Sequence, residues 1–207
     1  LVAALDAERD QLQAELDAVV YPVLSVPAEL TTLIFVHSLP SAHFNQPSPL
    51  ECPLLLTQIC RQWRAIAVGT AELWASVAIC SARPTSVELF EMWLTRSGVS
   101  PLRISLFEPN RMHASRLVNA CLQHADRWED IQLLLPDETL LGLLRDMPRL
   151  PLLRKIGMQY SGEGYKDADL ESLTLRDAPL LDTAMIERGR GVELKFGLPW
   201  NQLSSLK

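Results

Sequence analysis

The segment Ile59–Trp74 reads ICRQWRAIAVGTAELW, and it contains the most regular apolar pattern in the chain. From Leu56 onward, apolar residues recur at intervals of three and four residues, which is the spacing of one helix face. We therefore predict a continuous helical stripe that opens near Pro53 and ends near Gly69. The residues of this stripe are Leu56, Ile59, Cys60, Trp63, Ile66 and Ala67.

Cys60 is predicted to be a small hydrophobic residue beneath Trp63. Its neighbours at helical distance, Leu56 and Trp63, offer no cation that would favour a reactive thiolate. A zinc site can be drawn from His37, His43, Cys52 and Cys60, but the spacing matches no zinc finger or ribbon. We therefore predict no metal and no other cofactor, and we expect all the cysteines to be reduced.

The composition limits which kinds of partner and which cell compartment we expect for this protein. The net charge is -6, and no basic run is present, which argues against nucleic acid because phosphate binding needs clustered Lys and Arg. No apolar stretch reaches the roughly 18 residues of a membrane span, and the N-terminus has no signal-peptide pattern. We expect a cytoplasmic or nuclear protein that binds neither nucleic acid nor membrane.

Residues 1–21 are predicted to form an amphipathic helix that Pro22 ends. Leu5, Leu12 and Val19 lie seven residues apart, with Leu16 between them, as in a coiled coil. Two interpretations remain open at this point: coiled-coil self-association with another chain, or a helix that lies on its own domain.

The segment 26–40, VPAELTTLIFVHSLP, predicts a second short amphipathic helix. Pro27 suits a first helical turn, and Glu29 lies near the positive end of the helix dipole. Its apolar face is predicted to contain Leu30, Leu33 and Ile34, together with His37. The Ser- and Pro-rich segment 41–53 that follows shows no periodicity and is predicted to be an exposed loop.

In their order and spacing, residues 22–79 resemble the F-box, the helical module of ubiquitin-ligase substrate receptors. Val26 stands where leucine is usual, and the loop 40–52 is longer than in compact F-boxes, as in an insertion-bearing fungal type. The matching residues are Val26-Pro27-x-Glu29-Leu30, Ile34-Phe35, Leu54-Leu55-Leu56, Ile59-Cys60-Arg61-x-Trp63-Arg64-x-Ile66-Ala67 and Leu73-Trp74.

This resemblance implies a partner, because F-boxes dock on the small adaptor that links them to a cullin-RING ligase. Short helices cannot hide every face of so apolar a segment, and a partner helix would cover the remainder. By position, the residues implied to line or support the adaptor contact are Pro27, Glu29, Leu30, Ile34, Phe35, Leu55, Ile59, Cys60 and Trp63.

From residue 80 onward, predicted helices alternate with predicted strands. Thr85-x-x-Glu88 is a capping box, and Gly98 is a good helix stop, so 85–98 is predicted to be a helix. The segment 101–107, PLRISLF, alternates like a strand. Further helix-then-strand units follow, which predicts parallel strands because each helix provides the crossover.

The predicted strands resemble the L-x-x-L-x-L core of leucine-rich repeats. The spacing is uneven, and Ala178 stands where the usual motif closes with Asn or Cys, so the repeats are irregular. Leu203-x-x-Leu206 opens a further unit, and we expect the array to be truncated. An ordinary α/β domain with leucine-rich strands is the alternative. The matching segments are Trp128-x-x-Ile131-x-Leu133, Leu153-x-x-Ile156-x-Met158, Leu170-x-x-Leu173-x-Leu175 and Leu194-x-Phe196.

The predicted fold is therefore α then α/β: an N-terminal helix over 1–21, an F-box module over 22–79 and a short, irregular leucine-rich-repeat solenoid with parallel strands over 80–207. This order of parts resembles a substrate receptor of an SCF-type cullin-RING ligase, which is not itself an enzyme. We expect a protein target at polar residues between the strand leucines, and their cations suit an acidic or phosphorylated target. These residues are Gln132, Arg154, Lys155, Ser172, Thr174 and Lys195.

Two alternatives remain. One is a structural repeat scaffold with no ligase role. The other is a hydrolase, for which a nucleophile, a base and an acid can be drawn, although the G-x-S-x-G, H-E-x-x-H and Gly-rich phosphate motifs are missing from the sequence. The hydrolase candidates are His113, His124, Asp126, Asp137, Ser115 and Cys121.

Overall fold

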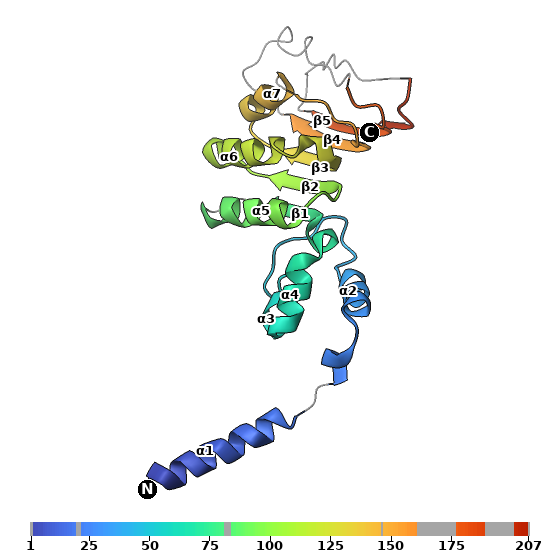
Figure 1. Cartoon of the computed structure of the whole chain (residues 1–207). Coiled ribbons are helices and arrows are strands. Elements are labelled where there is room, and N and C mark those ends of the chain that lie inside the picture. The colour runs from blue at the N-terminus through green and yellow to red at the C-terminus, as the bar shows by residue number, and fades with distance from the viewer. Residues whose placement is uncertain are drawn as a thin grey trace.

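The computed structural model describes residues 2–19, 22–80, 84–145, 147–160, 177–188 and 201–206. Helices come first, and strands alternate with helices afterwards, so the predicted order of α then α/β is confirmed (Figure 1). The helical part contains α1 (Val2–Asp17), the 3-10 helix η1 (Pro22–Ser25), α2 (Ala28–His37), α3 (Leu56–Ile59), α4 (Arg61–Gly69) and the 3-10 helix η2 (Ala71–Trp74). The α/β part contains β1 (Ser76–Cys80), α5 (Pro84–Arg96), β2 (Leu102–Phe107), α6 (Arg111–Leu122), η3 (Ala125–Arg127), β3 (Trp128–Leu134), α7 (Asp137–Arg145), β4 (Lys155–Tyr160), β5 (Thr183–Arg188) and β6 (Ser205–Leu206).

All the described strands belong to one parallel sheet, in which their order is their order along the chain, β1 to β6. Helices α5, α6 and α7 cover one side of this sheet (Figure 1). Parallel strands need such crossovers, because each strand must return to the same end of the sheet before the next begins. The parallel pairing predicted from the helix-then-strand order is confirmed.

The apolar residues of the strands face these helices. Ile104, Ile131 and Ile156 are fully buried and lie opposite one another in register. The inward direction predicted for the strand leucines is confirmed in the units 128–133 and 153–158. The other two predicted units, 170–175 and 194–196, lie outside the described residues.

The opposite side of the sheet, here called the open face, is not covered by any helix of the described residues. Alternate strand residues point to this side, as the pleat requires. The register places Arg103, Asp130, Lys155 and Thr183 opposite one another in one row across β2 to β5. The next row contains Ser105, Gln132, Gly157 and Met185.

The helical stripe is not continuous, so that prediction was wrong. Cys60 has φ -153° and ψ 171°, an extended conformation that separates α3 from α4. Its sulfur accepts a hydrogen bond from the Trp63 backbone N–H at 3.4 Å, and it therefore caps α4. A helix start leaves backbone donors without partners, and a side-chain acceptor at the capping position satisfies one of them. Cys60 is therefore a cap rather than packing beneath Trp63.

The predicted C-terminal stop of α5 is confirmed, whereas its predicted N-terminal capping box is not. The helix begins at Pro84, so Thr85 lies inside the first turn and is not the N-terminal cap of a capping box. Proline is favoured there because the first turn needs no N–H from it. Gly98 has φ 55°, the left-handed conformation that glycine adopts without strain after a helix end.

The helical module and the sheet share one hydrophobic core, which runs from Phe35 to Ala184. Trp74, at the end of the module, is fully buried, and its ring lies edge-on to that of Trp93 in α5, with centroids 4.8 Å apart. The Arg96 guanidinium lies 4.5 Å from the Trp74 ring centroid, and Trp93 Nε1 donates to the Ser76 carbonyl at 3.1 Å. The sheet begins with β1 at Ser76, inside the segment 22–79, so the two parts join without a linker.

The loop 41–53 does not extend freely into solvent, and its prediction as an exposed loop was wrong in part. Asn45 is buried, and its carbonyl accepts a hydrogen bond from the Ala78 N–H of β1 at 2.8 Å. The Ser76 hydroxyl donates to the His43 carbonyl. This loop covers the outer edge of β1, where an exposed strand would otherwise present unpaired backbone groups.

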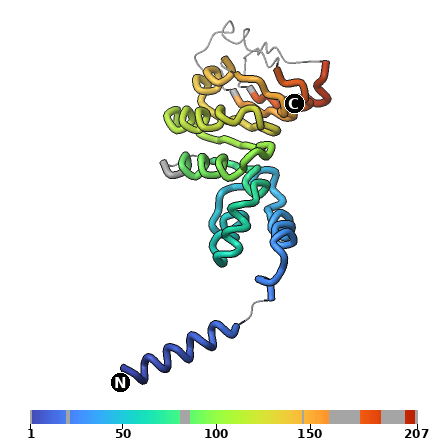
Figure 2. Tube along the Cα trace, in the orientation of Figure 1, coloured from blue at the N-terminus to red at the C-terminus, as the bar shows by residue number. Residues whose placement is uncertain are grey.

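Helix α1 makes no such contacts. None of its residues is buried, and it points away from the remainder of the chain (Figures 1 and 2). The interpretation in which it lies on its own domain is therefore wrong, while coiled-coil self-association stays a prediction. In the part of the chain that the structure describes, no helix is long and apolar enough to span a bilayer.

Candidate functional site

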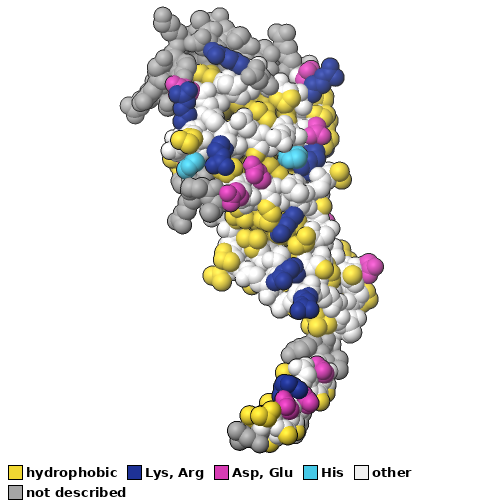
Figure 3. Space-filling model, turned by 60° about the vertical axis from the view of Figure 1, so that its left-hand side comes forward, with side chains coloured by type: hydrophobic (Ala, Val, Ile, Leu, Met, Phe, Trp, Pro, Cys, Tyr) yellow, Lys and Arg dark blue, Asp and Glu magenta, His cyan; other side chains and the backbone are white. Residues whose placement is uncertain are grey.

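An exposed apolar stripe on α2 is the first candidate surface. Leu30, Leu33 and Ile34 retain 52%, 55% and 57% of their accessible surface. The opposite side of the same helix contains Thr31 and Phe35, which are buried. Three large apolar side chains on the outward side of a short helix are typical of a protein-binding surface. Apolar side chains also reach the surface elsewhere on the helical module (Figure 3).

The α2 stripe is supported from below by an aromatic pair. Phe35 is 1% exposed, and its ring lies edge-on to that of Trp63 in α4, with centroids 4.9 Å apart. This contact fixes α2 against α4. The segment before α2 is also attached to α4, because the Gln62 side-chain amide donates to the Leu24 carbonyl at 3.1 Å.

The side chains implied to contact the adaptor differ in how much of their surface is exposed. Phe35 is buried, so it supports the surface and does not line it. Cys60 and Trp63 are half-buried. Leu33 was missed as a contact residue, although its spacing from Leu30 already placed it on this face. The exposed members of the predicted set are Pro27, Glu29, Leu30, Ile34, Leu55 and Ile59.

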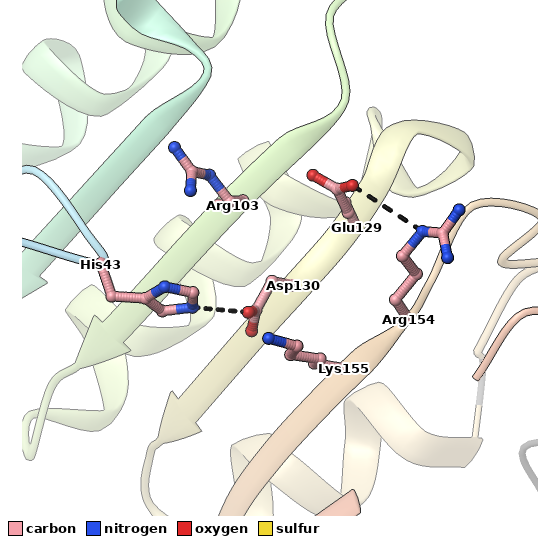
Figure 4. A pocket seen from close by; sticks show the side chains of 6 residues that line it. All are labelled: His43, Arg103, Glu129, Asp130, Arg154 and Lys155. Atoms are coloured by element: carbon pink, nitrogen blue, oxygen red, sulfur yellow. Dashed lines mark hydrogen bonds and ion pairs between the residues drawn. The ribbon is translucent and has the colours of Figure 1, made fainter. Parts of the chain in front are cut away.

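A hollow on the open face of the sheet is the second candidate surface (Figure 4). Its volume is about 200 Å³. Arg103 in β2, Asp130 in β3 and Lys155 in β4 form its floor in one register row, and His43 reaches it from the loop beside β1. The lining residues are His43, Arg103, Glu129, Asp130, Arg154 and Lys155.

Both acidic side chains of the hollow have partners. His43 Nε2 lies 2.6 Å from Asp130 Oδ2, a hydrogen bond to a carboxylate that is only 6% exposed. A carboxylate so deeply buried is costly without such a partner. Arg154 Nε lies 3.9 Å from Glu129 Oε1 in a looser, exposed pair.

The remaining cations of the hollow are Arg103 and Lys155. Neither side chain forms an ion pair or a hydrogen bond with any residue that the structure describes. They lie on either side of Asp130, on the neighbouring strands. In the hollow, both carboxylates therefore have a partner, whereas the Arg103 and Lys155 side chains have none among the described residues.

The predicted target-binding residues are partly brought together here. Arg154 and Lys155 line the hollow, and Gln132 lies in the next row of the open face, beside Gly157. Ser172, Thr174 and Lys195 lie outside the described residues. Arg103 was not among the predicted residues, although the alternation of PLRISLF indicated its outward direction. His43 was not among them either, because it lies in a loop without periodicity, which gives no signal.

The residues considered for a hydrolase have other contacts. The Ser115 hydroxyl donates to the Arg111 carbonyl of its own helix at 2.9 Å. Cys121 is buried, and this burial raises the pKa of its thiol above the ordinary range, so it stays protonated. Burial and the nearby Arg127 lower the pKa of His124. In the described residues, no hydrogen bond joins the Ser115 hydroxyl or the Cys121 thiol to a histidine side chain.

Three of the four residues considered for zinc have other contacts. His43 binds Asp130, Cys52 Sγ lies 3.2 Å from the Ser38 hydroxyl, and Cys60 caps α4. Within the described ranges, no group of three or more His, Cys, Asp or Glu side chains could hold a metal ion.

Comparison with known proteins gives no relative. No family model matches the chain, and neither a curated protein nor a solved structure matches it. The assignment of function therefore depends on the residues and geometry of this chain.

Proposed function

We propose that this protein is a non-catalytic substrate receptor of an SCF-type cullin-RING ubiquitin ligase. In this proposal the helical module over 22–79 is an F-box that binds the ligase adaptor. The α/β part over 80–207 is an irregular leucine-rich-repeat solenoid that binds a protein target. The single observation that carries the proposal is the exposed apolar stripe of α2, within the segment whose sequence resembles the F-box.

The α2 stripe supports adaptor binding for an energetic reason. Removing apolar surface from water is worth roughly 25 cal/mol per Å². Leu30, Leu33 and Ile34 are more than half exposed in the isolated chain, so a partner gains free energy by covering them. The aromatic pair of Phe35 and Trp63 holds the stripe in place before the partner arrives, which lowers the entropic cost of binding.

The sheet supports the repeat assignment. Each strand pairs with the next strand along the chain, and the described helices of this part lie on one side. Stacking of successive strand-and-helix units on their neighbours is typical of repeat solenoids. Such stacking leaves the other side of the sheet, the open face, available for a target.

The junction between the two parts also supports a receptor. A receptor must hold its target at a defined position relative to the adaptor, because ubiquitin transfer is performed by other subunits. The buried Trp74, packed against Trp93 and beneath Arg96, joins the module to the sheet through a shared core. A flexible linker would not fix this position.

Co-purification of the full chain with the adaptor tests the proposal. A stable complex of the two proteins, which also recruits the cullin, is expected. A chain that folds but forms no complex would contradict the proposal. It would favour the alternative of a structural scaffold, in which the repeats bind partners without any ligase.

A further inference from the structure

Helix α1, with the turn that follows it, has an apolar stripe that is exposed along its whole length. The large apolar side chains keep between 49% and 72% of their accessible surface, and no residue of α1 is buried. Together with Arg9 they recur at intervals of three and four residues, as do the contact positions of a coiled coil. The apolar residues of this surface, here called the α1 stripe, are Val2, Leu5, Leu12, Leu16 and Val19.

A helix of this length needs a partner to be stable. α1 has 16 residues, only just more than the roughly 12 to 15 below which an isolated helix is marginal in water. Most helix stability in proteins comes from packing of an apolar face, and α1 has no such packing within the described chain. Its last turn contains no basic residue, while Glu15 and Asp17 lie near the negative end of the helix dipole. A partner that covers the stripe and brings cations to this end would stabilise α1 in both respects.

Carboxylates border the α1 stripe on both sides. α1 contains five acidic residues and one basic residue, so it holds most of the chain's net charge of -6. The one cation, Arg9, is already paired, because its guanidinium lies 3.4 Å from an Asp6 oxygen and 2.6 Å from an Asp10 oxygen. Helical spacing places Glu8 and Glu15 along one border of the stripe, and Asp6, Asp10 and Asp17 along the other.

Three of these carboxylates have no cationic partner. Glu15 and Asp17 accept hydrogen bonds from the neutral side chains of Gln11 and Gln13, at 3.1 and 2.8 Å. Among the described residues, neither these two carboxylates nor Glu8 forms an ion pair. Acidic and apolar side chains lie next to one another at this end of the molecule (Figure 3). A helix with Lys or Arg beside its own apolar stripe would therefore complement both features.

The same charges disfavour a second copy of this chain as the partner. In a parallel pair, equivalent contact positions face each other, so Arg9 would meet Arg9 of the second copy inside the contact. In an antiparallel pair, equivalent borders run against each other, so Glu8 of one copy would lie beside Glu15 of the other. Both arrangements bring like charges together, and such repulsion is how coiled coils reject a wrong partner.

We propose that α1 is a docking helix for a basic amphipathic helix of another protein, and that the two pair in a short heterotypic coiled coil. The partner helix carries large aliphatic side chains at its contact positions and Lys or Arg at the positions that flank them. Nucleic acid and acidic membrane surfaces do not fit, because their phosphates would be repelled by the carboxylates of α1. α1 precedes the segment 22–79 that resembles the F-box, so this inference goes beyond the proposed ligase role and does not depend on it.

Peptide binding by the full chain tests the docking helix. The probe is a fluorescent synthetic peptide of three heptads, with Leu at the contact positions, Lys at the flanking positions and Ala or Gln elsewhere. A second peptide has Glu in place of every Lys. When binding is followed by anisotropy at physiological ionic strength, the lysine peptide is expected to bind at least about tenfold more tightly than the glutamate peptide.

One pair of variants tests the α1 stripe. Leu12→Gln removes an apolar contact and is expected to weaken binding of the lysine peptide by about tenfold. Ala14→Gln introduces the same side chain on the opposite side of α1, and is expected to stay within about twofold of wild type. Neither change disturbs the core, because no residue of α1 is buried.

A second pair of variants tests the charged border. Glu8→Lys combined with Glu15→Lys is expected to weaken binding of the lysine peptide by about tenfold, because attraction at the border becomes repulsion. Glu88→Lys combined with Glu91→Lys makes the same change of charge at exposed positions of α5. This control is expected to stay within about threefold of wild type, since salt screens charges that lie more than about 8 Å from the peptide.

Three results would overturn the proposal: no binding of the lysine peptide by the wild type, equal binding of the two peptides, or unchanged binding by either Leu12→Gln or the Glu8 and Glu15 double variant. Sedimentation equilibrium of the full chain tests a second copy as the occupant. A monomer is expected. A dimer that Leu12→Gln dissociates and Ala14→Gln retains would assign the α1 stripe to self-association and overturn the heterotypic pair.

Discussion

Replacement of Trp74 by alanine tests the shared core of the helical module and the sheet. The Trp74 side chain is fully buried, its Nε1 donates to the Ala67 carbonyl at 2.8 Å, and its ring contacts Trp93 and Arg96. Deleting a buried tryptophan to alanine costs about 3 to 5 kcal/mol of unfolding free energy. Loss of the aromatic pair and of the cation above the ring places Trp74→Ala at about 4 to 5 kcal/mol.

Urea unfolding of the full chain measures this effect. Far-UV circular dichroism reports the helices and strands together, while tryptophan fluorescence reports side chains in both parts, among them Trp63 in α4, Trp74 at the junction and Trp128 in β3. Wild type is expected to show one transition that coincides for both probes, since one core unfolds cooperatively. With a urea slope of about 3 kcal/mol/M, Trp74→Ala is expected to lower the midpoint by about 1.5 M.

Trp74→Phe is the matched control, because it keeps an aromatic ring but removes the hydrogen bond to Ala67. It is expected to cost about 1 to 2 kcal/mol, from one lost hydrogen bond and a smaller cavity. A Trp74→Ala cost below about 1 kcal/mol, or two separate transitions in the wild type, would refute a core shared by the module and the sheet.

Three further predictions concern single side chains. Trp63→Ala is expected to cost about 2 to 3 kcal/mol in urea unfolding, less than a buried tryptophan because Trp63 is half-buried beside Phe35; an unchanged midpoint would show that the pair does not hold α2. Cys60→Ser is expected to keep the helix cap, whereas Cys60→Ala is expected to cost about 1 kcal/mol in the same assay, and equal stability of the two variants would contradict the capping role. Burial raises the pKa of the Cys121 thiol, so a thiol reagent at pH 8 is expected to modify exposed Cys80 quickly and Cys121 only on unfolding. Because the folded pKa is raised, the stability that Cys121 contributes is present below the ordinary thiol pKa and is lost as pH rises above it. Rapid labelling of both cysteines in the folded chain would contradict this burial.

The α/β part could be predicted because its signals are local. Alternation in the segments of β2 and β3 identifies strands, and the helical segments between them require parallel pairing. Burial of Ile131, Leu133 and Ile156 follows from the same pattern. The pairing of the strands and the side of the sheet that faces the core could therefore be predicted from the sequence.

The remaining features depend on contacts between distant residues. The hydrogen bond between His43 and Asp130 joins residues 87 positions apart, and the loop that carries His43 has no periodicity. The break at Cys60 was missed because an apolar-compatible residue at helical spacing fits a continuous stripe as well as a cap. For α2, periodicity identified an apolar face with Leu30 and Ile34, but it could not show that this face points outward.

The measurement that tests the central claim most directly is binding of the adaptor by the full chain with Ile34→Lys. Ile34 is 57% exposed, so a lysine is accommodated in the free protein, but it would be buried in the complex at a cost of at least about 2 kcal/mol. The matched control is Val99→Lys, which introduces the same charge at an apolar residue that is 90% exposed and far along the chain from α2. Measured by calorimetry with the purified adaptor, wild type and Val99→Lys are expected to bind alike, and Ile34→Lys to bind about 30-fold more weakly or not at all. Equal binding by Ile34→Lys, or no complex with the folded wild type, would contradict the assignment of α2 as the adaptor-binding surface.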